Sequence, residues 1–245
     1  MVRTRGFQPL NRGSIPRSAA NNMYDVIRTF GIDYIYFDLS FLIVFIATLI
    51  FLKKKIPFLA FFIGGLLINF IIDWGIWLHA GVREISFLNN SFWNIFVFFL
   101  WFSLSYGVEY AYVFLMFEGK KKLKWTLFVL FGWLAVAFLS QWLPINDIQI
   151  TTIRHMSDFR ILRAGIVMIG FGLLFLLKYN WKKIAFLFLI GFLIHFMMEF
   201  SLLISGIRPG SFLILLENSL IEFNMGVPFF YILWDKILRK RISTT

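Results

Sequence analysis

Apolar residues occur in long runs along this chain, and short charged segments separate the runs. A helix needs about 20 mostly apolar residues to cross a bilayer. Seven runs approach that length, although in the fifth only residues 164–177 are free of charge. The pattern predicts seven transmembrane helices. Their approximate ranges are 34–52, 57–79, 92–117, 123–143, 159–177, 183–205 and 212–235.

Composition supports this interpretation. Hydrophobic residues make up 60% of the chain and charged residues 15%, whereas soluble domains hold about 25% charged residues. We therefore predict an all-α integral membrane protein, in the cell membrane if the source is prokaryotic. Cysteine is absent, which excludes disulfides, thiolate metal sites and cysteine nucleophiles.

Residues 1–33 precede the first apolar run. The first 22 are basic and lack an apolar core, so they are neither a cleavable signal peptide nor a span. Met23–Phe30 has the composition of a short interfacial helix, entered from Ser18, Asn21 or Asn22. Residues 1–22 before it are predicted to form a flexible basic arm.

Charge is distributed unevenly between the two ends of the predicted spans. Every lysine, from Lys53 to Lys240, falls at one set of ends, and the whole net charge of +11 belongs to that side. The positive-inside rule makes this side cytoplasmic, with the N-terminus outside and the C-terminus inside. The arginines of the N-terminal arm oppose this orientation but are outnumbered. Lysines at helix ends suit anionic lipid head groups, so nucleic-acid binding is not needed to explain the basic composition.

Two stretches of the chain resemble each other. Residues 65–83 and 191–208 align at an offset of 126, with one residue lost before the ends, which places Asn69 on His195 and Asp73 on Glu199. In each copy the two polar residues are four positions apart and share one helical face. Each copy ends in Gly-x-Arg, at Arg83 and Arg208.

Weaker matches extend this similarity to the flanking runs, for example Asp33 with Asp158 and Tyr112 with Tyr231. They indicate two parallel three-helix repeats joined by a linker helix, a 3+1+3 plan. The predicted divisions are 34–117 for the first repeat, 118–158 for the linker helix and an external loop, and 159–245 for the second repeat with a basic cytoplasmic tail.

The 3+1+3 plan with an external N-terminus resembles that of the SWEET sugar transporters and the wider PQ-loop group. The resemblance is one of topology. No Pro-Gln pair occurs in the chain, and Pro228 aligns with Glu109, so no functional residue is carried over. By the same resemblance, the chain can oligomerise.

Charged groups lie within the predicted spans. Each costs at least about 2.5–3.5 kcal/mol in hydrocarbon, so such groups usually face a protein interior or a wet cavity. We expect a polar pocket between the repeats that opens outward and binds substrate or couples protons. Its predicted residues are Asn69, Asp73, Arg83, Arg163, His195, Glu199, Arg208, Asn218, Glu222 and Asn224.

A purely structural role is the alternative interpretation of this set. Arginine and carboxylate side chains can simply hold helices together, with Arg163 on Asp38 or Glu199 and Arg208 on Glu217. This explains Asp73, Glu199 and His195 less well, because they lie deeper than the arginines. Glu109, in the inner half beside Tyr106, either relays protons or bonds to a neighbouring tyrosine.

No cofactor or metal site is predicted. His195 and Glu199 have metal-ligand spacing, but His79 and His155 are expected at the outer surface. A retinal Schiff base would need a lysine in mid-membrane, and every lysine lies at an edge.

Three functions remain open. The predicted function is a transporter of a small solute, with coupling to protons or ions left open, and with kinks at Gly107, Gly226 and Pro228. The alternative is an intramembrane enzyme acting on a lipid or isoprenoid, with Glu199 or Asp73 as general acid or base and His195 as a relay. A scaffold or receptor is the third, and an arginine partner for every carboxylate would favour it.

Overall fold

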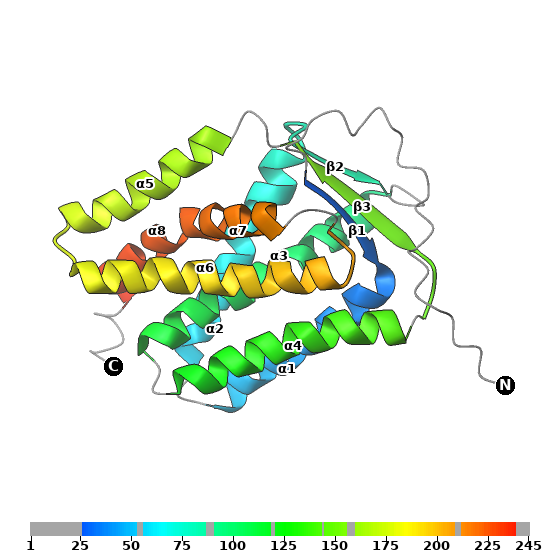
Figure 1. Ribbon diagram of the computed structural model, residues 1–245, viewed down its shortest axis with the longest axis horizontal. Helices are drawn as coiled ribbons and strands as arrows, with labels where there is room; N and C mark the ends of the chain where they lie inside the picture. The colour runs from blue at the N-terminus through cyan, green and yellow to red at the C-terminus, as the bar shows by residue number, and fades with distance from the viewer. Residues whose placement is uncertain are drawn as a thin grey trace.

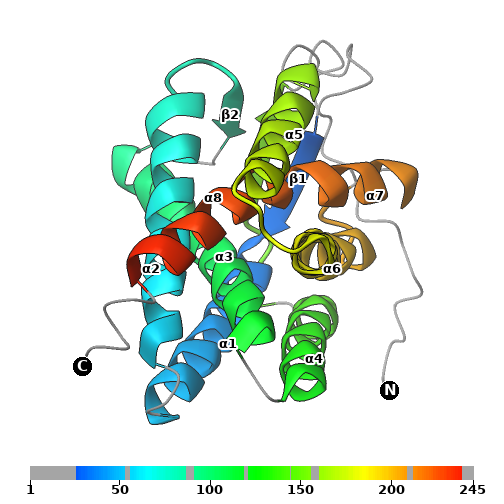
Figure 2. The same cartoon turned by 90° about the vertical axis from the view of Figure 1, so that its left-hand side faces the viewer.

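The chain forms a bundle of helices with a small sheet at one end (Figures 1 and 2). The computed structural model describes residues 26–52, 56–86, 91–118, 121–143, 145–155, 160–208 and 212–238. The longer helices are α1 (Ile32–Phe51), α2 (Ile56–Phe70), α3 (Phe92–Glu118), α4 (Lys122–Trp142), α5 (Arg160–Leu176) and α6 (Trp181–Ile204).

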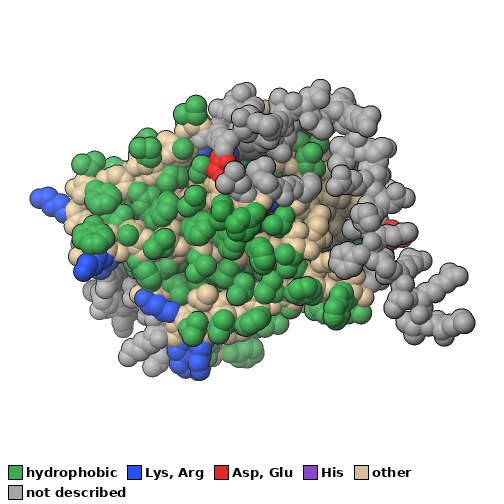
Figure 3. All heavy atoms as spheres, viewed as in Figure 1, with side chains coloured by type: hydrophobic (Ala, Val, Ile, Leu, Met, Phe, Trp, Pro, Cys, Tyr) green, Lys and Arg blue, Asp and Glu red, His purple; other side chains and the backbone are tan. Residues whose placement is uncertain are grey.

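Five helical segments of the described chain are long and apolar enough to cross a membrane. They are Ile32–Phe51, Phe58–Trp77, Phe92–Phe117, Lys122–Trp142 and Trp181–Ile204. Large side chains on their outer faces are exposed, such as Ile43 at 65% and Phe131 at 61%. Figure 3 shows a largely hydrophobic surface over the helices, with basic side chains toward one end. These features support the predicted class, a helical integral membrane protein.

The fifth and seventh predicted spans differ from that expectation. Helix α5 is shorter than a usual span, and the predicted continuous helix over 212–235 is wrong. That segment divides into α7 (Phe212–Ile221), the 3-10 turn η4 (Phe223–Met225), α8 (Val227–Leu233) and the π-helical turn η5 (Trp234–Leu238).

Proline explains the break in the seventh segment. Pro228 lies in the first turn of α8, where its missing N–H is tolerated, but it cannot continue a helix begun upstream. A kink at Gly226 and Pro228 is therefore present as predicted. Gly107 has another role, since α3 is continuous and a Cβ there would lie 2.8 Å from the Phe62 carbonyl oxygen of α2.

The second span changes helical type. Helix α2 continues directly into the π-helix η3 (Ile71–Trp77), which contains Asp73. A π-turn inserts an extra residue per turn and so redirects the side chains around it. Such turns often coincide with functional sites.

A three-stranded antiparallel sheet was not expected from the sequence. It consists of β1 (Val26–Gly31), β2 (Arg83–Ser86) and β3 (Gln149–Arg154), in the order β1-β3-β2. The proposed interfacial helix over Met23–Phe30 is therefore wrong for residues 26–30, while 23–25 lie outside the described residues. The predicted external loop likewise contains a strand. Pairing with β3 favours an extended chain here, because the sheet buries alternate side chains against the helices.

Sheet and lysine-bearing connections lie at opposite ends of the bundle. The α3–α4 and α5–α6 connections, which carry Lys121 and Lys178, are far from the strands in Figure 1. Between the two ends, the core is rich in aromatic side chains, including Phe45, Phe99 and Trp133. The repeat and the orientation across the membrane stay predictions.

Candidate functional site

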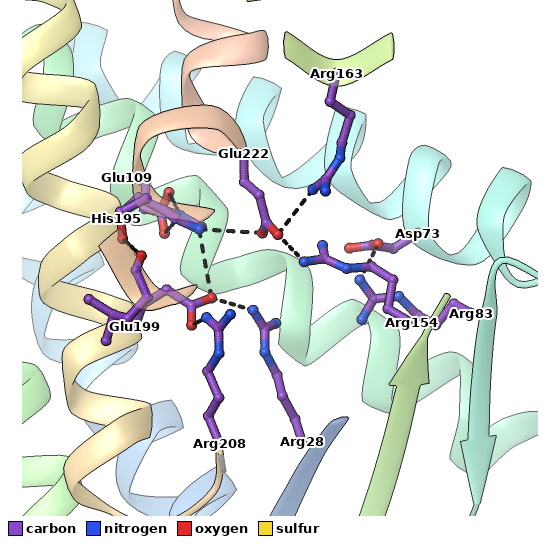
Figure 4. Close-up of polar contacts among 12 residues, drawn as sticks. Arg28, Asp73, Arg83, Glu109, Arg154, Arg163, His195, Glu199, Arg208 and Glu222 are labelled. Atoms are coloured by element: carbon purple, nitrogen blue, oxygen red, sulfur yellow. Dashed lines mark hydrogen bonds and ion pairs between the residues drawn. The ribbon is translucent and has the colours of Figure 1, made fainter. Parts of the chain in front are cut away.

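Charged side chains meet inside the bundle beneath the sheet (Figure 4). We call this set the charged cluster. None of its members is more than 7% exposed. The cluster consists of Arg28, Asp73, Arg83, Glu109, Arg154, Arg163, His195, Glu199, Arg208 and Glu222.

Each strand of the sheet contributes one arginine to the cluster. Arg28 belongs to β1, Arg83 to β2 and Arg154 to β3. Arg83 and Arg154 are directly opposite in the β2–β3 register. Like charges in that position repel, so nearby carboxylates must compensate. Asp73 and Glu222 do so, because Asp73 pairs with Arg83 and Glu222 with Arg154.

Both Gly-x-Arg sequences have the same local geometry. Gly81 and Gly206 follow the ends of helical segments and have φ angles of +70° and +73°. This left-handed conformation ends a helix and reverses the chain, and glycine adopts it without strain. Two residues later, Arg83 and Arg208 are buried, at 2% and 3% exposure. Both side chains are therefore directed into the protein interior and away from solvent.

Carboxylates of the cluster have several cationic partners. Glu199 of α6 pairs with Arg28 and Arg208. Glu222, between α7 and η4, pairs with Arg154 and, at 3.3 Å between Nη1 and Oε1, with Arg163 of α5. Asp73 Oδ1 lies 2.8 Å from Arg83 Nη2. Arginines thus reach Asp73, Glu199 and Glu222, whereas Glu109 pairs with His195, so the scaffold criterion of an arginine for every carboxylate is met only in part.

The individual pairs differ from those predicted. Arg163 contacts Glu222, and the prediction of Asp38 or Glu199 is wrong. Asp38 instead accepts hydrogen bonds from Trp101 and Ser105 of α3. Arg208 bonds to Glu199, where Glu217 was expected. The reason is local, because the turn after α6 directs Arg208 back toward Glu199 of its own helix.

His195 lies at the centre of the carboxylates. Its Nδ1 is 3.1 Å from both oxygens of Glu109, so Glu109 belongs to this cluster and does not form a separate inner relay. Tyr106 and Phe223 stack on the imidazole, with centroid distances of 6.2 and 6.3 Å. Its Nε2 faces Glu222 Oε2 at 3.4 Å and Glu199 Oε1 at 3.7 Å.

The protonation state of His195 determines whether these contacts attract or repel. If Nδ1–H donates to Glu109 and the ring is neutral, the Nε2 lone pair faces carboxylate oxygens. A second proton turns that repulsion into a charge-assisted hydrogen bond. His195 is therefore placed to gain and lose a proton among three carboxylates.

A divalent cation suits this group less well. His195, Glu199 and Glu222 offer ligand atoms that lie within 4.8 Å of one another, and a second carboxylate on His195 is a common supporting contact in metal sites. Glu199 and Glu222, however, each pair with two guanidinium groups. A metal ion would have to displace those arginines or lie beside them, which like-charge repulsion opposes.

The predicted asparagines bond to backbone atoms. Asn69 Nδ2 donates to the Gly65 carbonyl. Asn224 Nδ2 donates to Leu220 and Phe188, which ties the broken segment to α6. For Asn218 the bond is a main-chain one, from the Glu222 amide to the Asn218 backbone carbonyl, and its buried side-chain Nδ2 has no hydrogen-bond partner among the described residues. These residues support the backbone around the cluster.

Sequence reasoning missed Arg28 and Arg154. Both follow an alternating pattern, since Val26, Arg28 and Phe30 are buried in β1 and Ile150, Thr152 and Arg154 in β3. The β-branched run of residues 150–153 is typical of a strand. Its period of two could have identified Arg154 as an inward-facing residue.

The chain has no match among known protein families, curated proteins or solved structures. Function must therefore be inferred from the chemistry of the cluster and not from its fold.

Proposed function

We propose that this protein is a multi-pass membrane transporter that couples the movement of a small solute to protons, with the charged cluster as its site. One observation carries the proposal. His195 is held by Glu109 on one side and faces Glu199 and Glu222 on the other, inside a bundle whose helices can cross a membrane. Ionisable groups at such positions commonly mark ion pathways and proton relays.

Coupling follows because protonated His195 and the arginines compete for the same carboxylates. When His195 is protonated, its Nε2–H is placed to bond to Glu222 or Glu199, and the arginines on those residues become less tightly engaged. When the proton leaves, both carboxylates depend on arginine alone. A solute that contacts the arginines would thus bind with an affinity set by the proton, and binding energies are reciprocal between two linked sites.

The break in the seventh segment supplies a place for movement. Glu222 lies where α7 ends, and Gly226 and Pro228 separate it from α8. Transporters commonly use discontinuous helices at their binding sites, because the free backbone groups line a cavity. Tilting of α7 relative to α8 would move Glu222 away from His195 and open the cluster toward one side.

The orientation of the chain across the membrane and the two three-helix repeats belong to the same proposal. The lysine-bearing end would be cytoplasmic and the sheet would cover the cluster from the outside. The segments 34–117 and 159–245 would move relative to each other around Asp73 and Glu199, which are both buried. Similarity between the two Gly-x-Arg turns supports this arrangement.

Proteoliposomes with a trapped pH indicator can test the proposal. We expect external solutes from a panel of sugars, amino acids, carboxylates and phosphate to include one that drives proton movement. His195→Gln should abolish coupling, and Asp73→Asn with Glu199→Gln should reduce uptake. Uptake that is unaffected by the double substitution would exclude these carboxylates as the coupling site, and no flux with any solute would contradict transport.

An intramembrane enzyme is the second candidate. A histidine with Nδ1 on a carboxylate and Nε2 directed into a polar site has the geometry of a general base. Nanodiscs distinguish the two functions because they have no separate compartments. Product formation from a phospholipid or isoprenoid phosphate in nanodiscs, lost in His195→Gln, would favour the enzyme.

A further inference from the structure

We infer that the charged cluster binds a tetrahedral oxyanion, a phosphate or diphosphate group, through the guanidinium groups of Arg28, Arg83, Arg154 and Arg208. This inference names the ligand class of the proposed transport site and so rests on the proposed function. The phosphate group can come from a free solute or from a lipid.

Unused hydrogen-bond donors carry the inference. Among the residues that the structure describes, Nε of Arg28, Arg83 and Arg154 and Nη2 of Arg208 have no hydrogen-bond partner. The four arginines are at most 3% exposed. Buried donors are almost always hydrogen-bonded in folded proteins, so these four atoms are available to a bound group with acceptor oxygens. Several convergent guanidinium donors match the oxygens of a phosphate group.

Charge within the cluster favours an anion. Five guanidinium groups face four carboxylates, so the ten residues carry one net positive charge with His195 neutral and two with it protonated. Burial lowers the pKa of Arg83 and Arg208, and the neighbouring Arg28 adds to this effect. An anion would oppose both effects, whereas a cation would increase the repulsion.

Aromatic rings hold the arginines in position. The guanidinium carbons of Arg28 and Arg83 lie 5.6 and 5.0 Å from the centre of the Phe102 ring. Arg83 and Arg154 also lie 5.7 and 5.5 Å from Trp77. Both rings thus restrict the positions of the guanidinium groups, and the sheet register fixes Arg83 opposite Arg154. Positioned donors lose little entropy on binding, which favours affinity.

Ligand-dependent stability in nanodiscs tests the inference. Unfolding is followed by tryptophan fluorescence while inorganic phosphate, pyrophosphate or chloride is added at equal ionic strength to protein in phosphatidylcholine nanodiscs. A second arm adds phosphatidic acid to the nanodiscs. We expect a saturable rise in Tm with phosphate or pyrophosphate, or with phosphatidic acid, and none with chloride. The arm that responds identifies the free or the lipid source.

Conservative variants show where binding occurs. Arg28→Lys and Arg154→Lys keep the charge but lose the planar fork, so the Kd should rise at least about tenfold. Lys183→Gln removes an exposed positive charge at the opposite end and should bind like the unaltered protein. No Tm response to any oxyanion or to phosphatidic acid would overturn the inference, as would unchanged binding in both arginine variants.

Binding and flux separate the two proposals. Oxyanion binding without any coupled flux in proteoliposomes would keep the site and contradict the transporter. Coupled flux of a neutral or cationic solute without oxyanion binding would keep the transporter and overturn the ligand class.

Discussion

The Nδ1 atom of His195 lies 3.1 Å from both carboxylate oxygens of Glu109, although the two residues are 86 positions apart. The contact joins α6 to α3 at a point where both side chains are fully buried. It fixes the direction of Nε2 toward Glu199 and Glu222, and hence the geometry that a proton on His195 would encounter.

Removing Glu109 should destabilise the protein strongly. Glu109→Ala leaves a buried imidazole without its partner, for which we expect a loss of about 3–5 kcal/mol in the free energy of unfolding. Glu109→Gln keeps an acceptor for Nδ1–H and should cost less. Unfolding in mixed micelles, followed by tryptophan fluorescence, measures both. The exposed Glu84 provides the control, since Glu84→Ala should change stability by under about 0.5 kcal/mol. Equal effects at the two positions would contradict the contact.

Arg28 and Arg208 should compensate for each other. Because both pair with Glu199, each single change to Met leaves one guanidinium in place. The double variant should lose at least about 1 kcal/mol more than the sum of the singles. Adding Glu199→Gln to the double variant should recover stability, because it removes the buried carboxylate charge that is left without a guanidinium partner. Additive losses in the same unfolding assay would exclude a shared partner.

Left-handed glycines should respond to substitution differently from an extended one. Gly81 and Gly206 have positive φ, and a Cβ at either position would meet nothing within 4 Å. Gly81→Ala and Gly206→Ala should therefore cost about 1–2 kcal/mol of stability from backbone strain alone. Gly31 is the matched control, with equal space and φ −72°. Gly31→Ala should be neutral or slightly stabilising, and a loss there as large as at Gly206 would argue against strain as the cause.

Replacing Tyr110 by Phe should show which of the close contacts between Tyr110 and glycine residues involve the Tyr110 hydroxyl. A Cβ at Gly226 would lie 1.9 Å from the Tyr110 hydroxyl oxygen, whereas one at Gly65 would lie 2.4 Å from the ring carbon Cδ2. Both alanine variants should be destabilised by overpacking, typically by about 1–3 kcal/mol. Tyr110→Phe should rescue much of the Gly226→Ala loss and little of the Gly65→Ala loss. Gly172→Ala, with open space, is the control, and equal rescue of both would contradict the packing.

Membrane orientation can be tested by labelling, because the chain contains no cysteine. Glu84→Cys places one thiol in the sheet and Lys183→Cys places one at the lysine-bearing end, and both positions are exposed. If the lysine-bearing end is cytoplasmic, an impermeant maleimide should label Cys at position 84 in intact cells and at position 183 only after permeabilisation. The reverse pattern would invert the proposed topology.

Part of the candidate site was predictable from local pattern. Asp73, His195, Glu199 and Glu222 interrupt apolar runs, and a charged residue in hydrocarbon must find a polar partner. Their burial follows from that cost. The choice of partner does not, because Arg28 is 171 positions from Glu199 and Arg154 is 68 from Glu222. Such pairs form only when the sheet closes over the bundle.

The sequence by itself determined that this chain is a helical, membrane-type protein, since the length and polarity of an apolar run decide whether a helix can cross a bilayer. It also predicted a kink in the seventh segment, because Pro228 cannot donate the hydrogen bond that a continuous helix needs, whereas the division of that segment into α7, η4, α8 and η5 was not predicted. Only the tertiary structure decided that Val26–Gly31 forms a strand, because β1 gains its hydrogen bonds from β3, more than 100 residues away. The same pairing brings Arg28 and Arg154 into the core, where burial allows their charges to act on Glu199 and Glu222.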